Sequence, residues 1–200
     1  MQKIVLASGN AGKLKEFKKL LQHCGFDVLP QSDFNVPEVA ETGLSFVENA
    51  IIKARHAAEH TGLPAIADDS GLEVDALKGQ PGIYSARYAG EQCSDKDNNK
   101  KLLQALMNIP EPLRSARFQC VLAFMRHSSD PTPVICQSCW DGNILFEEHG
   151  ENGFGYDPLF FVPEHKCSSA ELSRQIKNTI SHRAKAMQKL LLHWQDNRSQ

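Results

Sequence analysis

The hydrophobic period of the chain changes within its first 25 residues, and this change restricts the folds that the chain can adopt. Residues 3–7, Lys-Ile-Val-Leu-Ala, form a short apolar run that leads into Ser-Gly-Asn, as a buried strand does where it enters a tight loop. From Lys13 to a stop at Gly25, apolar residues recur at helical spacing instead. These positions are Leu14, Phe17, Leu20, Leu21 and Cys24. A strand, a loop and a helix in this order predict an α/β fold.

A second helix is predicted over residues 44–60, with Thr42 as its N-cap and Gly62 as its stop. Its apolar stripe comprises Leu44, Val47, Ile51, Ala54 and Ala58. Residues 63–67 then form an apolar run, which predicts a strand that stops at Asp68.

The alternation of strands and helices continues to the C-terminus. The further predicted elements are a loop over 79–90, a helix from the Ser94 cap through Met107, strands over 117–126, 133–140, 144–147 and 159–162, a short helix capped by Ser168 and Glu171, and a last helix opened by Ser181 with Ala184, Met187, Leu191 and Trp194 on one face. No repeat or low-complexity linker interrupts the pattern. We therefore expect a single continuous α/β domain over residues 1–200.

Charge and hydropathy exclude several classes of protein. The 200 residues carry 22 Lys and Arg against 24 Asp and Glu, a net charge of −2, so the chain lacks the basic surface of a duplex nucleic-acid binder. A small anionic substrate needs only a few local cations and stays compatible with this balance. No apolar run approaches the ~20 residues of a membrane span, and the first residues do not resemble a signal peptide. A soluble cytoplasmic protein is the expectation.

Six cysteines are expected to be reduced, because a chain of this length without a signal peptide rarely uses disulfides. Cys136 and Cys139 have CxxC spacing but lie in the predicted strand over 133–140, where residues three apart point to opposite faces. No second CxxC completes a zinc-binding set. We expect neither a metal nor a redox centre at this pair.

Residues 8–13, Ser-Gly-Asn-Ala-Gly-Lys, connect the first predicted strand to the first predicted helix. Glycines permit a close approach of the backbone, and free N–H groups at a helix start, together with Lys13, attract phosphate. The Walker A spacing is absent, since Leu14 follows Lys13. The segment is either a phosphate-binding loop or an ordinary turn with a solvated lysine.

Asp68 and Asp69 follow a predicted strand, at the edge where open α/β sheets bind their ligands. Adjacent carboxylates point in different directions, so one can hold Mg²⁺ while the other orients a ligand or water. The alternative is an Asp-rich turn. Other acidic candidates are Glu38, Glu41, Glu73 and Asp75.

Two glycines flank an aromatic residue in the segment Gly153-Phe154-Gly155-Tyr156-Asp157-Pro158. They let the ring project from a loop, where it can stack on a base, and the nearby aspartate can accept hydrogen bonds from a sugar or base. The alternative is a turn whose phenylalanine fills the core.

Basic residues gather at the start of the last predicted helix. Lys177 precedes it and Ser181-His182-Arg183 opens it, although the helix dipole disfavours cations there. A bound anion or an electronegative carbonyl edge would offset this cost. Otherwise these are solvated side chains.

Six segments, in this order along the chain, resemble the inosine/xanthosine triphosphate pyrophosphatase family, the Ham1-like house-cleaning enzymes. They are Ser8-Gly9-Asn10 with Lys13, Glu41-Thr42-Gly43 with Glu48-Asn49-Ala50, Ala67 to Leu72, Pro81 to Tyr88, Gly153 to Pro158, and Ser181-His182-Arg183. The resemblance covers essentially the whole chain and is nearest to the bacterial branch. It departs only at Ser8, a position that is often Thr in the family.

The resemblance implies a fold of two α/β lobes around an elongated, twisted mixed sheet with a central substrate cleft, usually as a homodimer. It implies Mg²⁺-dependent hydrolysis between the α- and β-phosphates of ITP, dITP, XTP and dXTP, which removes these nucleotides from the pool. It also implies that Asp69 is the catalytic carboxylate and that Glu41 and Asp69 surround the metal. The substrate-binding residues that it implies are Ser8, Gly9, Asn10, Ala11, Gly12, Lys13, Ser70, Phe154, Gly155, Tyr156, Asp157, Lys177, His182 and Arg183.

Physical chemistry agrees with these roles. A triphosphate needs Lys13, Lys177 and Mg²⁺ to neutralise its charge, and an aspartate beside the metal can orient or deprotonate water. We expect Phe154 to stack on the purine while residues 182–183 donate to its 6-keto oxygen. Adenine carries an amino group there and would leave buried donors unpaired, at a cost of ~1–3 kcal/mol each. Guanine shares the 6-keto group, so its rejection must act at the 2-amino position.

Two other functions stay open. One is a nucleotide-binding regulator that uses the same loops without turnover. The other is a broader nucleotide phosphatase that releases orthophosphate.

Overall fold

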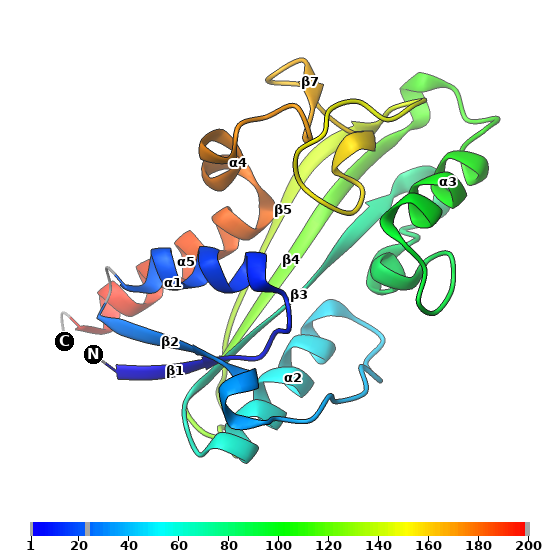
Figure 1. Ribbon diagram of the computed structural model, residues 1–200. Coiled ribbons are helices and arrows are strands. Elements are labelled where there is room, and N and C mark those ends of the chain that lie inside the picture. Colours follow the sequence, from blue (N-terminus) through cyan, green and yellow to red (C-terminus); the bar gives the residue numbers. More distant parts are fainter. Residues whose placement is uncertain (1, 23–24, 199–200) are drawn as a thin grey trace. The chain divides into compact units, whose positions relative to one another are not determined.

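The strand, loop and helix predicted at the N-terminus are present in the computed structural model, which describes residues 2–22 and 25–198 (Figure 1). Strand β1 (Gln2–Leu6) leads into helix α1 (Ala11–Gln22) and strand β2 (Phe26–Pro30). Because β1 and β2 pair in parallel, α1 is the crossover helix of a β-α-β unit. Cys24, one of its predicted apolar positions, lies outside the described residues.

The remaining elements follow the predicted order in part, and neither β2 nor the short strand at residues 167–168 was predicted. The remaining elements are α2 (Phe46–Thr61), β3 (Ala65–Val74), α3 (Asp95–Ala105), β4 (Ser115–Met125), β5 (Val134–Ile144), β6 (Phe160–Val162), β7 (Cys167–Ser168), α4 (Arg174–Ile180) and α5 (His182–Arg198), with 3₁₀ turns at Gln31–Phe34, Asp75–Leu77, Gly82–Arg87, Glu111–Leu113 and Asp157–Leu159. Among the described residues, no helix is long and apolar enough to span a membrane.

The strands form one mixed seven-stranded sheet in the order β2-β1-β3-β4-β5-β6-β7. β1 pairs in parallel with both β2 and β3, whereas β6 pairs antiparallel with β5 and β7. A mixed sheet combined with helices confirms the predicted α/β class. The chain divides into two compact units, the first comprising residues 1–69, 120–137 and 186–200 and the second comprising residues 70–119 and 138–185.

In the first unit, successive residues of β1 and β3 point to opposite faces of the sheet, as strand geometry requires. One face is packed against α1 and α5, in a buried cluster that includes Ile4, Leu6, Ile66, Phe17, Leu21, Met187 and Leu190. Figure 1 shows α2 on the opposite side of β1 and β3 from α1. The buried face of α2 consists largely of small residues, which include Ala50, Ala54, Ala57 and Ala58.

Helix α2 begins three residues later than its predicted cap implies. Ser45, not Thr42, is the N-cap, and its Oγ accepts a hydrogen bond from the Glu48 N–H. Leu44, predicted to lie on the apolar stripe, precedes the helix and is 84% exposed. The predicted stop is confirmed, since Gly62 adopts a left-handed φ of 64° and donates its N–H to the Ala58 carbonyl.

Strand β3 does not stop at Asp68, as predicted, but continues to Val74. Residues 65–69 are all buried, so both faces of this part of the strand are covered. Two adjacent aspartates in such a strand run against β-propensity, which is why the sequence pattern indicated a turn. The ion pairs described below explain how the strand accommodates them.

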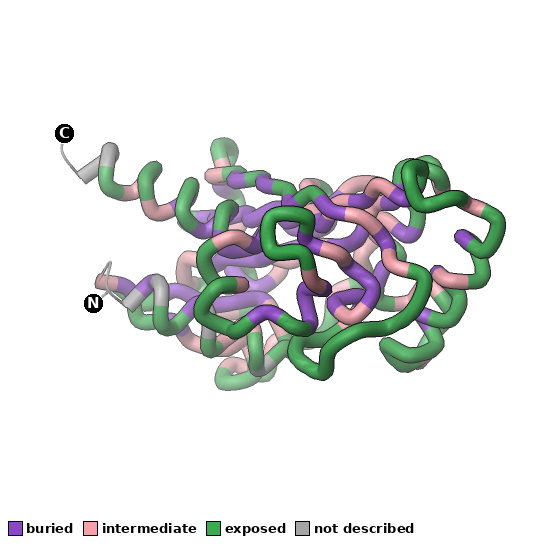
Figure 2. The backbone as a smooth tube through the Cα atoms, turned by 90° about the horizontal axis from the view of Figure 1, so that it is seen from above, coloured by how far each residue is buried: buried purple, intermediate pink, exposed green. Residues whose placement is uncertain are grey.

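The second unit has its own core. This buried cluster includes Leu72, Val74, Leu102, Leu106, Phe118, Trp140, Ile144, Leu159, Phe160 and Leu172. Ser94 caps α3 as predicted, and Asp97 completes a capping box that was not predicted. Burial along the chain is shown in Figure 2.

Two predicted boundaries in the second unit are wrong. β5 passes through Asp141-Gly142 to Ile144, and residues 144–147 form no separate strand. Gly142 marks a close approach rather than a turn, because a Cβ there would lie 2.4 Å from the Phe161 carbonyl oxygen of β6.

The predicted capping box of Ser168 and Glu171 also does not begin a helix. The Glu171 carboxylate does accept the Ser168 N–H at 2.7 Å, but Ser168 ends β7. α4 begins only at Arg174, with Ser173 as its N-cap.

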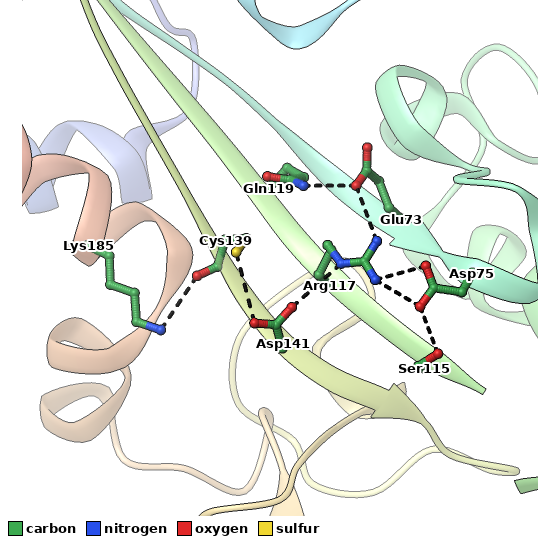
Figure 3. A network of polar contacts seen from close by, with 8 residues as sticks. All are labelled: Glu73, Asp75, Ser115, Arg117, Gln119, Cys139, Asp141 and Lys185. Carbon is green, nitrogen blue, oxygen red and sulfur yellow. Dashed lines mark hydrogen bonds and ion pairs between the residues drawn. The ribbon is translucent and has the colours of Figure 1, made fainter. Parts of the chain in front are cut away.

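One stretch of the sheet in the second unit carries charged side chains on neighbouring strands (Figure 3). Arg117 of β4 donates from Nη2 to both carboxylate oxygens of Asp75 at 2.8 Å, and it also contacts Glu73 at 3.9 Å and Asp141 at 3.5 Å. The hydrogen bond from Ser115 lowers the pKa of Asp75 below its usual range, and the contact with Arg117 lowers it further. These side chains are partly exposed, so the network is a polar face of the sheet and not part of the core.

The two cysteines of the CxxC motif lie on opposite faces of β5, as predicted. Cys136 is buried, whereas Cys139 is exposed. Because their side chains point in opposite directions, the two cysteines cannot bind one metal ion together.

Candidate functional site

Asp68 and Asp69 occupy adjacent positions of β3, so their carboxylates point to opposite faces of the sheet. Both residues are buried, with relative exposures of 1% and 8%. A buried carboxylate is costly unless a cation or several donors pair with it. Each of the two has a lysine partner, supplied by a different helix.

Lys13 of α1 pairs with Asp68, with 2.7 Å between Nζ and Oδ2. The sequence placed Lys13 in a candidate phosphate-binding loop but did not predict this pair. Asp68 shares its face of β3 with Ile66, which packs in the cluster containing α1. Lys13 thus lies at the start of α1 with its ammonium group directed to the sheet.

Asn10 caps the start of α1. Its Oδ1 accepts the N–H groups of Gly12 at 2.8 Å and Lys13 at 3.1 Å, and its own N–H donates to Ser8 Oγ at 3.2 Å. The expectation of free helix N–H groups is therefore wrong for Gly12 and Lys13. The loop is held in shape by its own side chains, with Gly9 and Asn10 exposed.

Lys53 of α2 lies between two carboxylates. Its Nζ is 2.7 Å from Asp69 Oδ1 and 2.8 Å from Glu41 Oε1. Glu41 belongs to the irregular segment that precedes α2, whereas Asp69 belongs to β3. The structure thus brings together the two residues predicted as metal ligands and adds a cation that the prediction did not include.

Asn49 joins the same group of residues from one turn earlier on α2. It is fully buried, its Oδ1 accepts the Gly43 N–H at 2.9 Å, and its Nδ2 lies 3.5 Å from Asp69 Oδ2. Gly43 fits only as glycine, because a Cβ there would lie 2.5 Å from the Glu48 Cβ. Asn49 therefore links the segment that carries Glu41 to the Asp69 carboxylate.

Burial raises the pKa of the Asp69 carboxyl, and the nearby Lys53 ammonium opposes this rise. The carboxylates around Lys53 raise the pKa of its ammonium against the opposing effect of burial, so Lys53 stays charged. A buried carboxylate with a raised pKa beside a fixed cation is a common arrangement for a general base.

Glu41 and Asp69 suit a hard divalent cation. Their oxygens converge on one cationic nitrogen, which shows that positive charge is stabilised at this point. Among residues 2–22 and 25–198, no three His, Cys, Asp or Glu side chains form a closed metal site. Mg²⁺ usually takes only one or two carboxylates, with water and substrate phosphates as its other ligands, so these two donors fit it. Glu38 is exposed in the same segment.

In the second unit, the Phe154 ring projects from its loop as predicted, with 53% of the residue exposed. Gly153 and Gly155 on either side adopt φ values of 84° and 62°, which glycine favours. A Cβ on Gly153 would lie 2.1 Å from Asp157 Oδ2. The alternative of a core-filling phenylalanine is wrong.

Two cations lie near the Phe154 ring. Lys177 Nζ is 5.6 Å and the Arg183 guanidinium carbon 5.9 Å from the ring centroid, within the range of cation–π attraction. Lys177 also pairs with Asp157, whose Oδ2 accepts the Phe154 N–H at 2.9 Å. Asp157 therefore forms an ion pair with Lys177 and also stabilises the loop through its hydrogen bond with Phe154.

Tyr156 is buried, in contrast to the exposed Phe154 in the same loop. It is 4% exposed and its hydroxyl donates to the Ser85 carbonyl at 2.8 Å. Burial raises the pKa of its phenol, so the group stays protonated. Its contact fixes the loop to the 3₁₀ turn over Gly82–Arg87.

His182 and Arg183 begin α5 and are both buried. The imidazole of His182 stacks on Phe118, with 4.9 Å between centroids and 18° between the planes. Ser181 caps the helix by accepting the Ala184 N–H at 3.3 Å. The alternative of solvated side chains is therefore wrong for His182 and Arg183. The structure brings Arg183, Lys177 and Phe154 together. Ser70, the next residue of β3 after Asp69, is partly buried.

Lys53 and Asn49 were missed as site residues from the sequence. They lie four residues apart on α2, on the face that buries Phe46, Ala50 and Ala54. Polar residues on an otherwise apolar helix face are the signal that could have identified them.

Comparison with known proteins identifies the family of this chain. The sequence profile of the Ham1 family matches residues 4–193. A Vibrio parahaemolyticus protein named dITP/XTP pyrophosphatase is 66% identical over 190 residues, 95% of each chain. A Shigella flexneri protein of the same name is 57% identical over 96% of this chain and 97% of its own.

Solved structures agree as well. A HAM1 protein from Coxiella burnetii superimposes with a TM-score of 0.94 at 50% identity, over 98% of this chain and all of the other. The Staphylococcus aureus Ham1 protein does so with a TM-score of 0.90 at 42% identity, with the same coverage. On the match over residues 4–193 and these identities, the chain belongs to the Ham1 family.

Proposed function

We propose that this chain hydrolyses the noncanonical purine nucleoside triphosphates ITP, dITP, XTP and dXTP to the monophosphate and pyrophosphate. Family membership and the names of its relatives support this activity. The structural observation that carries the proposal is the pair of buried aspartates on β3, each neutralised by a lysine from a different helix. Together these residues combine a carboxylate base with cations that suit a polyphosphate.

The phosphates are bound by the Ser8–Lys13 loop and by Lys53. Lys13 carries the positive charge, and the Ser8–Lys13 loop has the exposed glycine and asparagine that a phosphate can approach. Lys53 supplies a second cation beside Asp69. These charges stabilise the negative charge that develops as the leaving group departs.

Asp69 acts as the general base. Water attacks the α-phosphorus, the bond from phosphorus to the oxygen that bridges to the β-phosphate breaks, and pyrophosphate leaves with the electron pair. The water proton moves to an Asp69 oxygen. Lys53 holds Oδ1 of this carboxylate and Asn49 lies against Oδ2, so the orientation of the base is fixed before the substrate binds.

Mg²⁺ is the proposed cofactor, held by Glu41 and Asp69. When bound, it neutralises phosphate charge and polarises the reacting phosphoryl group. Asp69 would then both orient the attacking water and hold the metal. Activity that is unchanged after treatment with EDTA would exclude this cofactor.

The purine is recognised by the loop that carries Phe154 and by the first residues of α5. Phe154 stacks on the base, while His182 and Arg183 donate to its 6-keto oxygen. Adenine presents an amino group at this position and would leave the donors unpaired, at a cost of ~1–3 kcal/mol per buried group. Asp157 and Lys177 position Phe154 and add charge near the nucleotide.

A product assay with ITP, XTP, dATP and GTP in the presence of Mg²⁺ tests the function. Pyrophosphate from ITP and XTP is expected. Orthophosphate would indicate the broader phosphatase, and binding without any product would indicate a nucleotide-binding regulator.

The Asp69→Asn variant tests the catalytic base in the same assay. Its pyrophosphate release from dITP is expected to be abolished while its circular dichroism spectrum is unchanged. Turnover near that of the wild type would remove Asp69 from the mechanism.

A homodimeric state and a cytoplasmic location, both expected from the sequence, belong to the same proposal. Light scattering on the eluting peak of a size-exclusion column tests the first. Fractionation of cells that express the chain tests the second.

A further inference from the structure

We propose that Asp95 and Asn99 of α3 are positioning residues for the loop that recognises the purine. They hold the peptide groups of Gly155 and so fix the place of the Phe154 ring next to it. This inference rests on the proposed function and concerns which residues determine substrate affinity.

Both polar groups of Gly155 are bound by α3. Its N–H donates to Asp95 Oδ2 at 2.6 Å, and its carbonyl oxygen accepts from Asn99 Nδ2 at 3.2 Å. Asp95 and Asn99 are four residues apart and therefore lie on the same face of the helix. A single residue of the loop is thus fixed to two successive turns of α3.

Asn99 is itself well anchored. It is 3% exposed, and its Nδ2 also donates to Glu148 Oε1 at 2.6 Å. An amide nitrogen carries two protons and can satisfy both acceptors. Since Asn99 is buried, its amide has little freedom to move away from the loop.

The hydrogen bonds between Phe154 and Asp157 lie within the loop and do not connect it to α3. Asp157 accepts the Phe154 N–H, and the Asp157 N–H donates to the Phe154 carbonyl at 3.3 Å. These bonds shape the loop internally but do not tie it to α3. The loop is also held from outside α3, by Tyr156 on Ser85 and by Lys177, the Ser169 hydroxyl and the Ala170 N–H on Asp157, but none of these bonds holds the Phe154–Gly155 peptide.

A neighbour of Asp95 provides a control that distinguishes loss of loop positioning from loss of helix stability. Asp97, two residues later in the same first turn, closes the capping box with Ser94 and does not contact the loop. Loss of Asp97 weakens the helix start, whereas loss of Asp95 releases the Gly155 N–H. The two aspartates therefore form a matched pair of substitution sites.

A mobile Phe154 lowers substrate affinity more than the rate of the chemical step. The ring contacts the base, which is remote from the phosphorus that reacts, so its contribution is similar in the ground and transition states. We expect Asp95→Ala to raise KM for dITP about tenfold and to change kcat by less than about threefold, as loss of a binding interaction does.

The test compares Asp95→Ala, Asn99→Ala and Asp97→Ala in steady-state kinetics with dITP and in hydrogen exchange measured by mass spectrometry. The first two variants are expected to raise KM and to speed exchange in a peptide that covers residues 150–157. Asp97→Ala is expected to lower the melting temperature while leaving KM unchanged. Asp95→Asn keeps an acceptor oxygen and is expected to restore most of the wild-type KM.

Equal KM values for Asp95→Ala and Asp97→Ala, or unchanged exchange in residues 150–157, would overturn the inference. The exchange measurement needs no substrate and is made on the wild type as well. If the wild type releases no pyrophosphate from dITP, the proposed function fails, yet the exchange data still decide whether α3 fixes the loop.

Discussion

The Nζ of Lys53 lies 2.7 Å from Oδ1 of Asp69. This contact ties the middle of α2 to β3, and it sets the electrostatic environment of the carboxylate proposed as the base. Burial raises the pKa of Asp69, and Lys53 opposes that rise.

Removal of the Lys53 charge should shift the acid limb of the pH profile. A base must be deprotonated, so kcat/KM falls as the pH drops through the pKa of Asp69. In Lys53→Met the effect of burial remains while the opposing cation is gone, so the limb moves to higher pH and kcat/KM at neutral pH falls at least about tenfold, or ~1.4 kcal/mol. Profiles of kcat/KM for dITP check this, with the exposed Lys100→Met as control. An acid limb at the wild-type position would contradict the assignment of Asp69 as the base.

Lys13 should be needed for stability as well as for phosphate binding. Lys13→Met leaves the Asp68 carboxylate buried without its ion-pair partner, which costs roughly 3 kcal/mol. The double variant Lys13→Met, Asp68→Asn removes that charge and is expected to regain most of the stability but not the wild-type KM. Urea unfolding and dITP kinetics on both variants test the two effects separately. A double variant as unstable as the single one would disprove this explanation.

Asn49→Ala should lower both stability and kcat. The substitution leaves the Gly43 N–H without its acceptor and removes the amide beside Asp69, at a cost of about 1–3 kcal/mol. Thermal unfolding and single-turnover hydrolysis of dITP measure the two consequences. Asn108→Ala, at an exposed position, is the control and should match the wild type in both.

The stability contributed by Asp130 should depend on pH. The hydrogen bond from Arg126 places the pKa of Asp130 far below its usual range. Because the folded-state pKa lies below the unfolded value of about 3.9, this contribution is complete above that value and is lost as the pH falls below it. The melting temperatures of the wild type and Asp130→Asn should therefore differ at pH 7 and converge toward pH 2. A difference that stays constant over this range would contradict the prediction.

The elements that the sequence predicts best are those with strong periodicity or explicit caps. β1, α1 and α3 follow directly from apolar spacing and from the Ser94 cap, whereas β2 was not predicted. β3 was misjudged because two aspartates in a buried strand are tolerated only through lysines distant in sequence. Gly142 looked like a turn because its close contact with Phe161 is a tertiary feature.

In the candidate site, too, local motifs could be predicted from the sequence, whereas tertiary contacts could not. The motifs around Asp69 and Phe154 could be identified locally, and the structure confirms that Phe154 projects outward. The Lys53 contacts depend on α2 lying beside β3, and the contact of Gly155 with Asp95 depends on α3 lying beside a loop 60 residues later. Local patterns contain no information on such pairings.

The opposite orientation of Asp68 and Asp69 on β3 makes the strand intolerant of changes in length. One residue inserted or deleted between Ala65 and Asp68 would exchange the two faces, so that each aspartate would meet the wrong helix. Asp69, the proposed base, would then point toward α1, and a substitution or a local rearrangement could not easily restore its position. We expect sequence drift in this segment to proceed by replacement of side chains, with its residue count held constant.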